Sequence, residues 1–146
     1  MAHRFPNILI HFVFSTASRQ DLIPRDLHQK LWAYLNGIGK NHNMPVLAAG
    51  GTTNHVHILV TLPPDMAPYK AVQVFKANSS RWLGKHGIEF AWQEGYGAFS
   101  VSASMRDIIV RYIESQAEHH KKRSYDDEFL TMLRKIGLTD VQDALG

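Results

Sequence analysis

Two histidines separated by a single valine occupy the apolar segment "NHVHILV", residues 54–60. Alternate residues of a β-strand face the same side, so His55 and His57 are expected to point together while Val56 anchors the opposite side. Because two residues along a strand span about 6.6 Å, both imidazoles can reach one metal ion. A catalytic metal usually needs at least three protein ligands, and a lone His-x-His pair is also typical of sheet histidines bonded to water or backbone. A third ligand must come from elsewhere in the chain.

A tyrosine and a glutamine stand one helical turn apart in "MRDIIVRYIESQAEHHKKR", residues 105–123. At about 100° per residue, Tyr112 and Gln116 share a stripe at the edge of an apolar helix face. Either residue alone is typical of a core margin. A phenol can attack a phosphodiester when a metal ion polarises the phosphate, and this chemistry needs no cysteine, serine triad or paired carboxylates. Imidazole and amide ligands favour Mn²⁺ or another transition ion on affinity, although Mg²⁺ serves where it is abundant.

The composition limits the other kinds of chemistry. The chain has no cysteine, which excludes disulfides, thiolate metal sites and cysteine nucleophiles. A net charge of +3 is compatible with a nucleic-acid partner. The 146 residues predict a single domain, 1–146. The sequence has no apolar run of the length that a membrane span needs and no signal pattern, so a cytoplasmic protein without membrane contact is expected.

The elements that must position these residues can be read from hydrophobic periodicity and turn signals. A strand is expected over 7–16, and two more in "MPVLAAG" and "NHVHILVTL" around the hairpin connection "GTTN". Helices are expected from Pro24 to about Asn41 and over 68–86. Residues 88–102 predict a fourth strand, broken at "EGYG". Ser104 and Asp107 match a capping box that opens a helix through about Lys122, and a short last helix is expected around 127–136.

This order of elements predicts an α+β fold of the ferredoxin-like type, also called split βαβ or RRM-like. Its antiparallel sheet carries helices on one face, with a further C-terminal helix that bears the tyrosine. The other sheet face is expected to be free for binding. His11 would lie near the two histidines if its strand neighbours theirs, but it is interpreted as structural.

Several motifs in this order and spacing closely resemble the small single-tyrosine HUH transposases of bacterial insertion sequences, the IS200-like transposase family. They are "HFVFST", "NHVHILV", "FKANSSRWL", "WQEGYGAFSVS" and "YIESQAEHHKKRSYDDEF". The resemblance covers about residues 8–130 and leaves 131–146 as a C-terminal tail.

The resemblance implies a DNA transposition and recombination enzyme that cuts and rejoins single-stranded DNA, recognising hairpins at the ends of its element. Carried over by position, His55, His57 and Gln116 become ligands of a divalent metal ion, Mg²⁺ or Mn²⁺. Tyr112 becomes the nucleophile that forms a 5′-phosphotyrosine intermediate and releases a 3′-OH. Family members are homodimers, in which one subunit's tyrosine helix can complete the other's site.

Cationic and aromatic residues are candidates for DNA contact, because single-stranded DNA is bound by cationic tracks and aromatic stacking. Where the family often has a Lys or Tyr followed by a basic residue, this chain has "ASRQ", and Arg19 can fill that role. The further candidates are Lys70, Lys76, Arg81, Lys85, Trp92, Tyr96 and His120. Charges on an exposed helix face are usually solvated, and aromatics at strand spacing are usually core.

Two other functions are compatible with the same residues. A domesticated protein of this fold could bind hairpin DNA or RNA without transposing, although a binding protein has no need for all four site residues. A replication-initiator or relaxase-like nicking enzyme would use the same chemistry, but such enzymes are generally larger.

Overall fold

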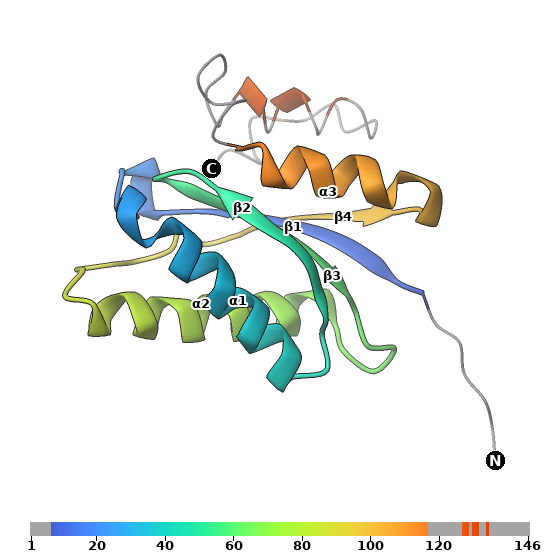
Figure 1. Cartoon of the computed structure of the whole chain (residues 1–146), viewed down its shortest axis with the longest axis horizontal. Coiled ribbons are helices and arrows are strands. Elements are labelled where there is room, and N and C mark those ends of the chain that lie inside the picture. The colour runs from blue at the N-terminus through green and yellow to red at the C-terminus, as the bar shows by residue number, and fades with distance from the viewer. Residues whose placement is uncertain (1–6, 117–126, 129, 132–133, 135–146) are drawn as a thin grey trace. The chain divides into compact units, whose positions relative to one another are not determined.

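A computed structural model of the chain describes residues 7–116, 127, 128, 130, 131 and 134 (Figure 1). The chain divides into two compact units, Met1–Gln116 and Ala117–Gly146. In the second unit the five described residues are helical, within the segment where a last helix was expected. The helix that carries Tyr112 ends at Glu114, with Ser115 as its C-cap, and the rest of its predicted extent, from 117 to Lys122, lies outside the described residues.

The first unit is built on a four-stranded antiparallel sheet (Figure 1). Its strands are β1 (Leu9–Ser15), β2 (Val46–Gly51), β3 (His55–Thr61) and β4 (Gly97–Val101). They lie in the order β2-β3-β1-β4, and every neighbouring pair is antiparallel. The hairpin of β2 and β3 places β3 beside β1, which is the predicted split βαβ arrangement. The α+β, ferredoxin-like prediction is therefore confirmed.

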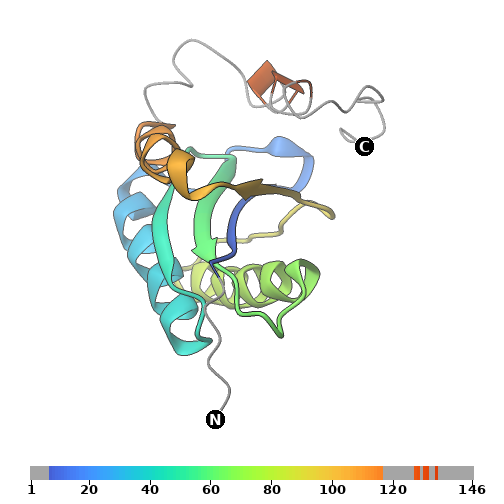
Figure 2. The same cartoon turned by 90° about the vertical axis from the view of Figure 1, so that its right-hand side faces the viewer.

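Two helices, α1 (His28–Asn41) and α2 (Pro68–Lys85), cover one face of the sheet (Figure 2). A short 3-10 turn, Arg25–Leu27, leads into α1, and Pro68 occupies the first turn of α2, where its missing N–H costs nothing. Every second residue of the central strands faces these two helices and packs against them in the main hydrophobic core. This core includes Phe12, Phe14, Leu31, Leu35, Val56, Ile58, Val60, Val72, Phe75 and Leu83.

The third helix, α3 (Arg106–Glu114), lies on the opposite face of the sheet, where it contacts β2 and β3 (Figures 1 and 2). Its buried Ile113 packs with Leu9, Ala48 and Leu59 in a second, smaller cluster. A β-carbon at Gly50 would collide with the carbonyl oxygen of Ile113, so glycine allows this close approach. The second face is therefore partly covered by α3 rather than free.

Two local predictions at the ends of elements are wrong. The N-cap of α3 is Met105, preceded by a 3-10 turn, Ala103–Met105, and no side chain caps the helix, so the Ser104 capping box does not form. The segment 88–102 is broken at "EGYG" and forms a strand at Gly97–Val101, as expected, but the part before the break is not a strand and makes one isolated bridge, between Trp92 and Thr16. A turn with positive φ at Gly95 separates the two halves.

None of the helices in the described part of the chain has the length and apolar character needed to cross a membrane.

Candidate active site

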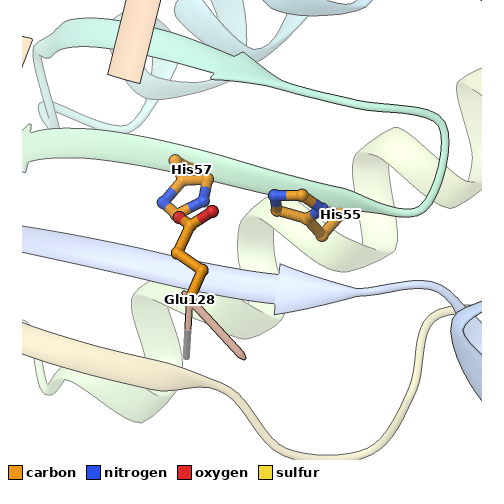
Figure 3. A group of neighbouring side chains, drawn as sticks. All are labelled: His55, His57 and Glu128. Atoms are coloured by element: carbon orange, nitrogen blue, oxygen red, sulfur yellow. The ribbon is translucent and has the colours of Figure 1, made fainter. Parts of the chain in front are cut away.

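The imidazoles of His55 and His57 project from β3 toward the α3 side of the sheet (Figure 3). Both side chains are fully buried. Their ring centroids are 5.0 Å apart, and one ring nitrogen of each lies within 4.8 Å of the other. Since β3 is paired on both edges, its backbone holds the two rings at a fixed spacing. Glu128, also drawn in Figure 3, belongs to the second unit and is not assigned to the site.

The Nδ1 atom of His55 faces two oxygens of the β2–β3 turn. It lies 2.9 Å from Oδ1 of Asn54 and 2.9 Å from Oγ1 of Thr52. An amide oxygen only accepts hydrogen bonds, so Nδ1 carries the proton and donates to Asn54. In the neutral ring, Nε2 then has the lone pair that a metal ion requires.

The Nδ1 atom of His57 lies 2.8 Å from Nε2 of His11, a buried residue of the neighbouring strand β1. Within the register, His57 pairs with Val13 and His11 pairs with Leu59, so the two imidazoles meet diagonally across the strands. His11 therefore lies beside the two histidines, as expected if its strand neighbours theirs, and its interpretation as structural stays a prediction.

Gln116 lies two residues beyond the end of α3 at Glu114 and is buried. Its Oε1 atom lies 3.2 Å from Nε2 of His55. Its Nε2 atom donates to the backbone carbonyl of Tyr112 at 3.4 Å, which directs the amide oxygen toward the histidine.

The ring of Tyr112 packs against the rings of His57 and His11 on the face of the sheet that α3 covers. The ring is perpendicular to that of His57, with centroids 5.6 Å apart, and edge-on to that of His11 at 6.2 Å. Tyr112 is half-buried, unlike the histidines. The structure thus brings together all four residues that the sequence singled out, although α3 follows β3 by more than forty positions.

This donor set fits a divalent cation. His55 Nε2 and Gln116 Oε1 both present lone pairs, and two such atoms repel each other unless a proton or a cation lies between them. Ligands held at about 2.1 Å and at right angles around one cation lie about 3 Å apart. The 3.2 Å separation is close to that value. His57, on the same strand face, can complete a set of three protein ligands.

Arg19 lies in a turn beside this site, in two consecutive residues with positive φ, Ser18 and Arg19. The turn is tied to the β2–β3 connection, because Asn54 Nδ2 donates to the Arg19 carbonyl at 3.4 Å and Thr53 Oγ1 donates to Asp21 at 2.6 Å. Asn54 therefore joins the Arg19 turn to the ring of His55. Strained backbone of this kind is common near functional sites.

Four of the predicted DNA contacts lie on α2, and three of them are exposed there. Lys70, Arg81 and Lys85 are exposed, and α2 covers the face of the sheet opposite to α3 (Figure 2). If these three residues contact DNA, they contact a part of it that lies outside the candidate active site. His120 lies outside the described residues.

The other predicted contacts support the segment between α2 and β4. Lys76 Nζ donates to the carbonyls of Gln93 and Gly95 at 2.8 and 2.7 Å. Burial lowers the pKa of Lys76, and the nearby Glu94 carboxylate opposes this. Trp92 stacks edge-on against Phe14 at 4.8 Å in the main core.

Tyr96 is 38% exposed and stands edge-on to Phe12, with ring centroids 6.3 Å apart. DNA contact by these residues stays a prediction. Sequence reasoning missed two polar partners of His55, Thr52 and Asn54, and the hydrogen bond between His11 and His57. The polar side chains of "TTN" directly before His55 are a sequence pattern from which Thr52 and Asn54 could have been predicted as its partners.

The chain is similar to one known protein family, Transposase IS200 like, whose model matches residues 4–116. That match spans both histidines, Tyr112 and Gln116. No curated protein matches the chain.

Solved structures that share its fold include two transposases. One, a crystal structure at 1.90 Å resolution, is of a protein from Deinococcus radiodurans R1 assigned as a transposase. It is 20% identical over 80% of this chain and 95% of its own, with a TM-score of 0.63. The other is a REP-associated tyrosine transposase bound to a REP hairpin, 17% identical over 77% of this chain and 70% of its own, with a TM-score of 0.56.

Proposed function

The chain belongs to the family of IS200-like transposases, and on this premise we propose that it cuts and rejoins single-stranded DNA through a covalent bond to Tyr112. One observation carries the proposal: the amide oxygen of Gln116 lies 3.2 Å from Nε2 of His55, while Tyr112, one turn earlier, packs against His57. A nucleophile and three potential ligands from distant segments thus share one site.

His55, His57 and Gln116 would hold a divalent cation, Mn²⁺ or Mg²⁺. When bound, the cation supplies a Lewis acid that polarises the scissile phosphate and offsets its developing charge. Three neutral ligands leave the cation's charge uncompensated, which suits an anionic substrate. The protein itself contributes the fixed orientations of the two buried histidine rings.

Tyr112 would act as the nucleophile. Its phenol oxygen forms a bond to phosphorus, and the bond from phosphorus to the 3′ oxygen of the preceding nucleotide breaks. The phenol proton is passed, through solvent, to the leaving 3′ oxygen, so the products are a 5′-phosphotyrosine and a free 3′-OH. Reversal by another 3′-OH joins strands without an external energy source, because one phosphodiester bond replaces another.

The substrate we propose is single-stranded DNA with a hairpin at the element end. A related tyrosine transposase of the same fold is bound to a REP hairpin, which supports this class of partner. We propose further that the chain forms a homodimer, which a solution mass near twice 16.6 kDa would support.

The deciding experiment mixes the purified full chain with hairpin oligonucleotides and Mn²⁺ or Mg²⁺ and looks for a protein–DNA adduct that resists SDS. The adduct is expected for the wild type and for Tyr69→Phe, a matched control at an exposed tyrosine of α2. It is expected to be absent for Tyr112→Phe and after chelation of the metal.

An adduct that persists in Tyr112→Phe would overturn the assignment of the nucleophile. If a broad panel of hairpins is bound but none forms an adduct, the chain is a hairpin-binding protein of the same fold. Cleavage confined to a replication-origin nick, without strand joining, would instead favour an initiator or relaxase-like enzyme.

A further inference from the structure

His11 is a buried histidine that the proposed chemistry does not itself use. It lies on β1 and is 2% exposed. Its Nε2 atom is 2.8 Å from Nδ1 of His57, so one of these two nitrogens must donate a proton to the other. The direction of that hydrogen bond decides which nitrogen of His57 has a lone pair.

Two arrangements are open to the neutral pair. If His11 donates, Nε2 of His57 carries the remaining proton and cannot bind a cation. If His57 donates from Nδ1, its Nε2 has the lone pair and His11 accepts through its own Nε2. Metal-bound histidines generally donate their second ring N–H to such a partner, which fixes the ring and raises its basicity.

We propose that His11 is a positioning residue that accepts the Nδ1–H of His57 and so holds His57 in the tautomer that can bind the metal. This inference rests on the proposed function, in which His57 is a ligand. The neighbouring His55 has the same arrangement, because Nδ1 faces the acceptor oxygen of Asn54 at 2.9 Å. Both histidines then present Nε2 as the ligand atom.

The two partners differ in one respect. The amide oxygen of Asn54 can only accept a hydrogen bond, so it requires the proton of His55 to be on Nδ1. The imidazole of His11 can accept or donate, so its own proton must be on Nδ1 for His57 to be competent. The ring of His11 also packs against the rings of Phe99 and Tyr112, with centroid separations of 6.0 and 6.2 Å, and these contacts help to orient it.

The first test needs no substitution. In the metal-free full chain with ¹⁵N-labelled histidine, NMR correlations across the ring identify which nitrogen of His57 is protonated. We expect Nδ1–H, with an unprotonated Nε2. A proton on Nε2 of His57 in the wild type overturns the inference, whatever the protein does with metal.

The second test measures Mn²⁺ affinity by calorimetry. His11→Phe preserves ring packing but removes the acceptor, and it is expected to weaken Mn²⁺ binding about 10–100-fold and to release His57 into a mixture of tautomers. His11→Gln replaces the acceptor with an amide oxygen and is expected to recover most of the affinity. Phe99→Leu is the matched control, because it alters the packing around His11 without touching the hydrogen bond.

The two proposals fail separately. If His57→Ala abolishes Mn²⁺ binding while His11→Phe changes neither the affinity nor the tautomer, His11 has no positioning role and the proposed function stands. If His57→Ala leaves Mn²⁺ binding intact, the ligand assignment and the inference fail together. Equal losses in His11→Phe, His11→Gln and Phe99→Leu would show a packing role only.

Discussion

The backbone of Gly50 faces the carbonyl oxygen of Ile113 so closely that no β-carbon fits between them. This approach seats α3 on β2 and, through α3, places Tyr112 and Gln116 above the histidines. Gly50 is therefore expected to control the position of Tyr112, the proposed nucleophile, although it takes no part in the proposed chemistry.

Gly50→Ala is expected to displace α3, to destabilise the protein by about 1–3 kcal/mol and to reduce adduct formation on the order of 100-fold. Urea denaturation and the hairpin assay measure the two effects. Gly37→Ala and Gly84→Ala are controls, because a β-carbon at either helical position meets nothing within 4 Å. Those changes are expected to stabilise by up to about 1 kcal/mol. Full adduct formation by Gly50→Ala would contradict the argument.

Gln116 offers a test of the third ligand. Gln116→Met keeps the length of the side chain but removes the oxygen that lies 3.2 Å from His55, and we expect Mn²⁺ affinity to fall at least about tenfold. Gln116→Glu keeps an oxygen and adds a negative charge, so it should bind Mn²⁺ more tightly but DNA more weakly. Calorimetry and a DNA-binding titration measure these opposite shifts. Unchanged Mn²⁺ affinity in Gln116→Met would remove Gln116 from the ligand set.

Lys76 is expected to stabilise the fold rather than contact DNA. Because its ammonium binds the carbonyls of Gln93 and Gly95, Lys76→Met should destabilise the protein by about 1–2 kcal/mol. Lys70→Met, at an exposed lysine of the same helix, should change stability by less than about 0.5 kcal/mol. Thermal and urea unfolding compare the two. If Lys76→Met is as stable as the wild type but binds DNA with a smaller salt dependence, its role is phosphate contact.

His28 predicts a pH dependence of stability. Burial lowers its pKa from 6.5, aided by Arg25 and opposed by the hydrogen bond to the Ile23 carbonyl and by Asp26. Around and just below 6.5 the unfolded chain then binds more protons at this site than the folded one, so stability rises as pH increases through that window. His28→Gln should show a smaller rise between about pH 5 and pH 7, measured by urea unfolding. Equal rises in both proteins would exclude His28 as a contributor.

The strand faces were predictable from the sequence because alternation is local. The pattern of β1 and β3 sends Phe12, Val56 and Ile58 into the main core and both site histidines to the other side, as the structure has them. Helical periodicity likewise predicts Tyr112 and Gln116 on one side, although α3 ends at Glu114 and Ser115 is its C-cap.

The rest depends on contacts between segments far apart in the chain. The His11–His57 hydrogen bond requires the diagonal offset of an antiparallel pairing, and the position of α3 depends on a missing side chain at Gly50. Neither of these two contacts gives a periodic pattern in the sequence from which it could be predicted. The start of α3 was misplaced because a capping box is a frequent pattern, while the backbone here enters the helix through a 3-10 turn at Ala103–Met105.

The central position of β3 has a consequence for motion. Its amides are hydrogen-bonded to β1 and β2 on both edges, so they can exchange with solvent only when the whole sheet opens. The described part of α3 has a single fully buried side chain, Ile113, and can separate from β2 at a much smaller cost in free energy. Hydrogen exchange should therefore be slow at the two histidines and fast along the helix of Tyr112. The histidines of the candidate site are therefore held rigidly on β3, whereas the proposed nucleophile Tyr112 lies on a helix that can move away from them.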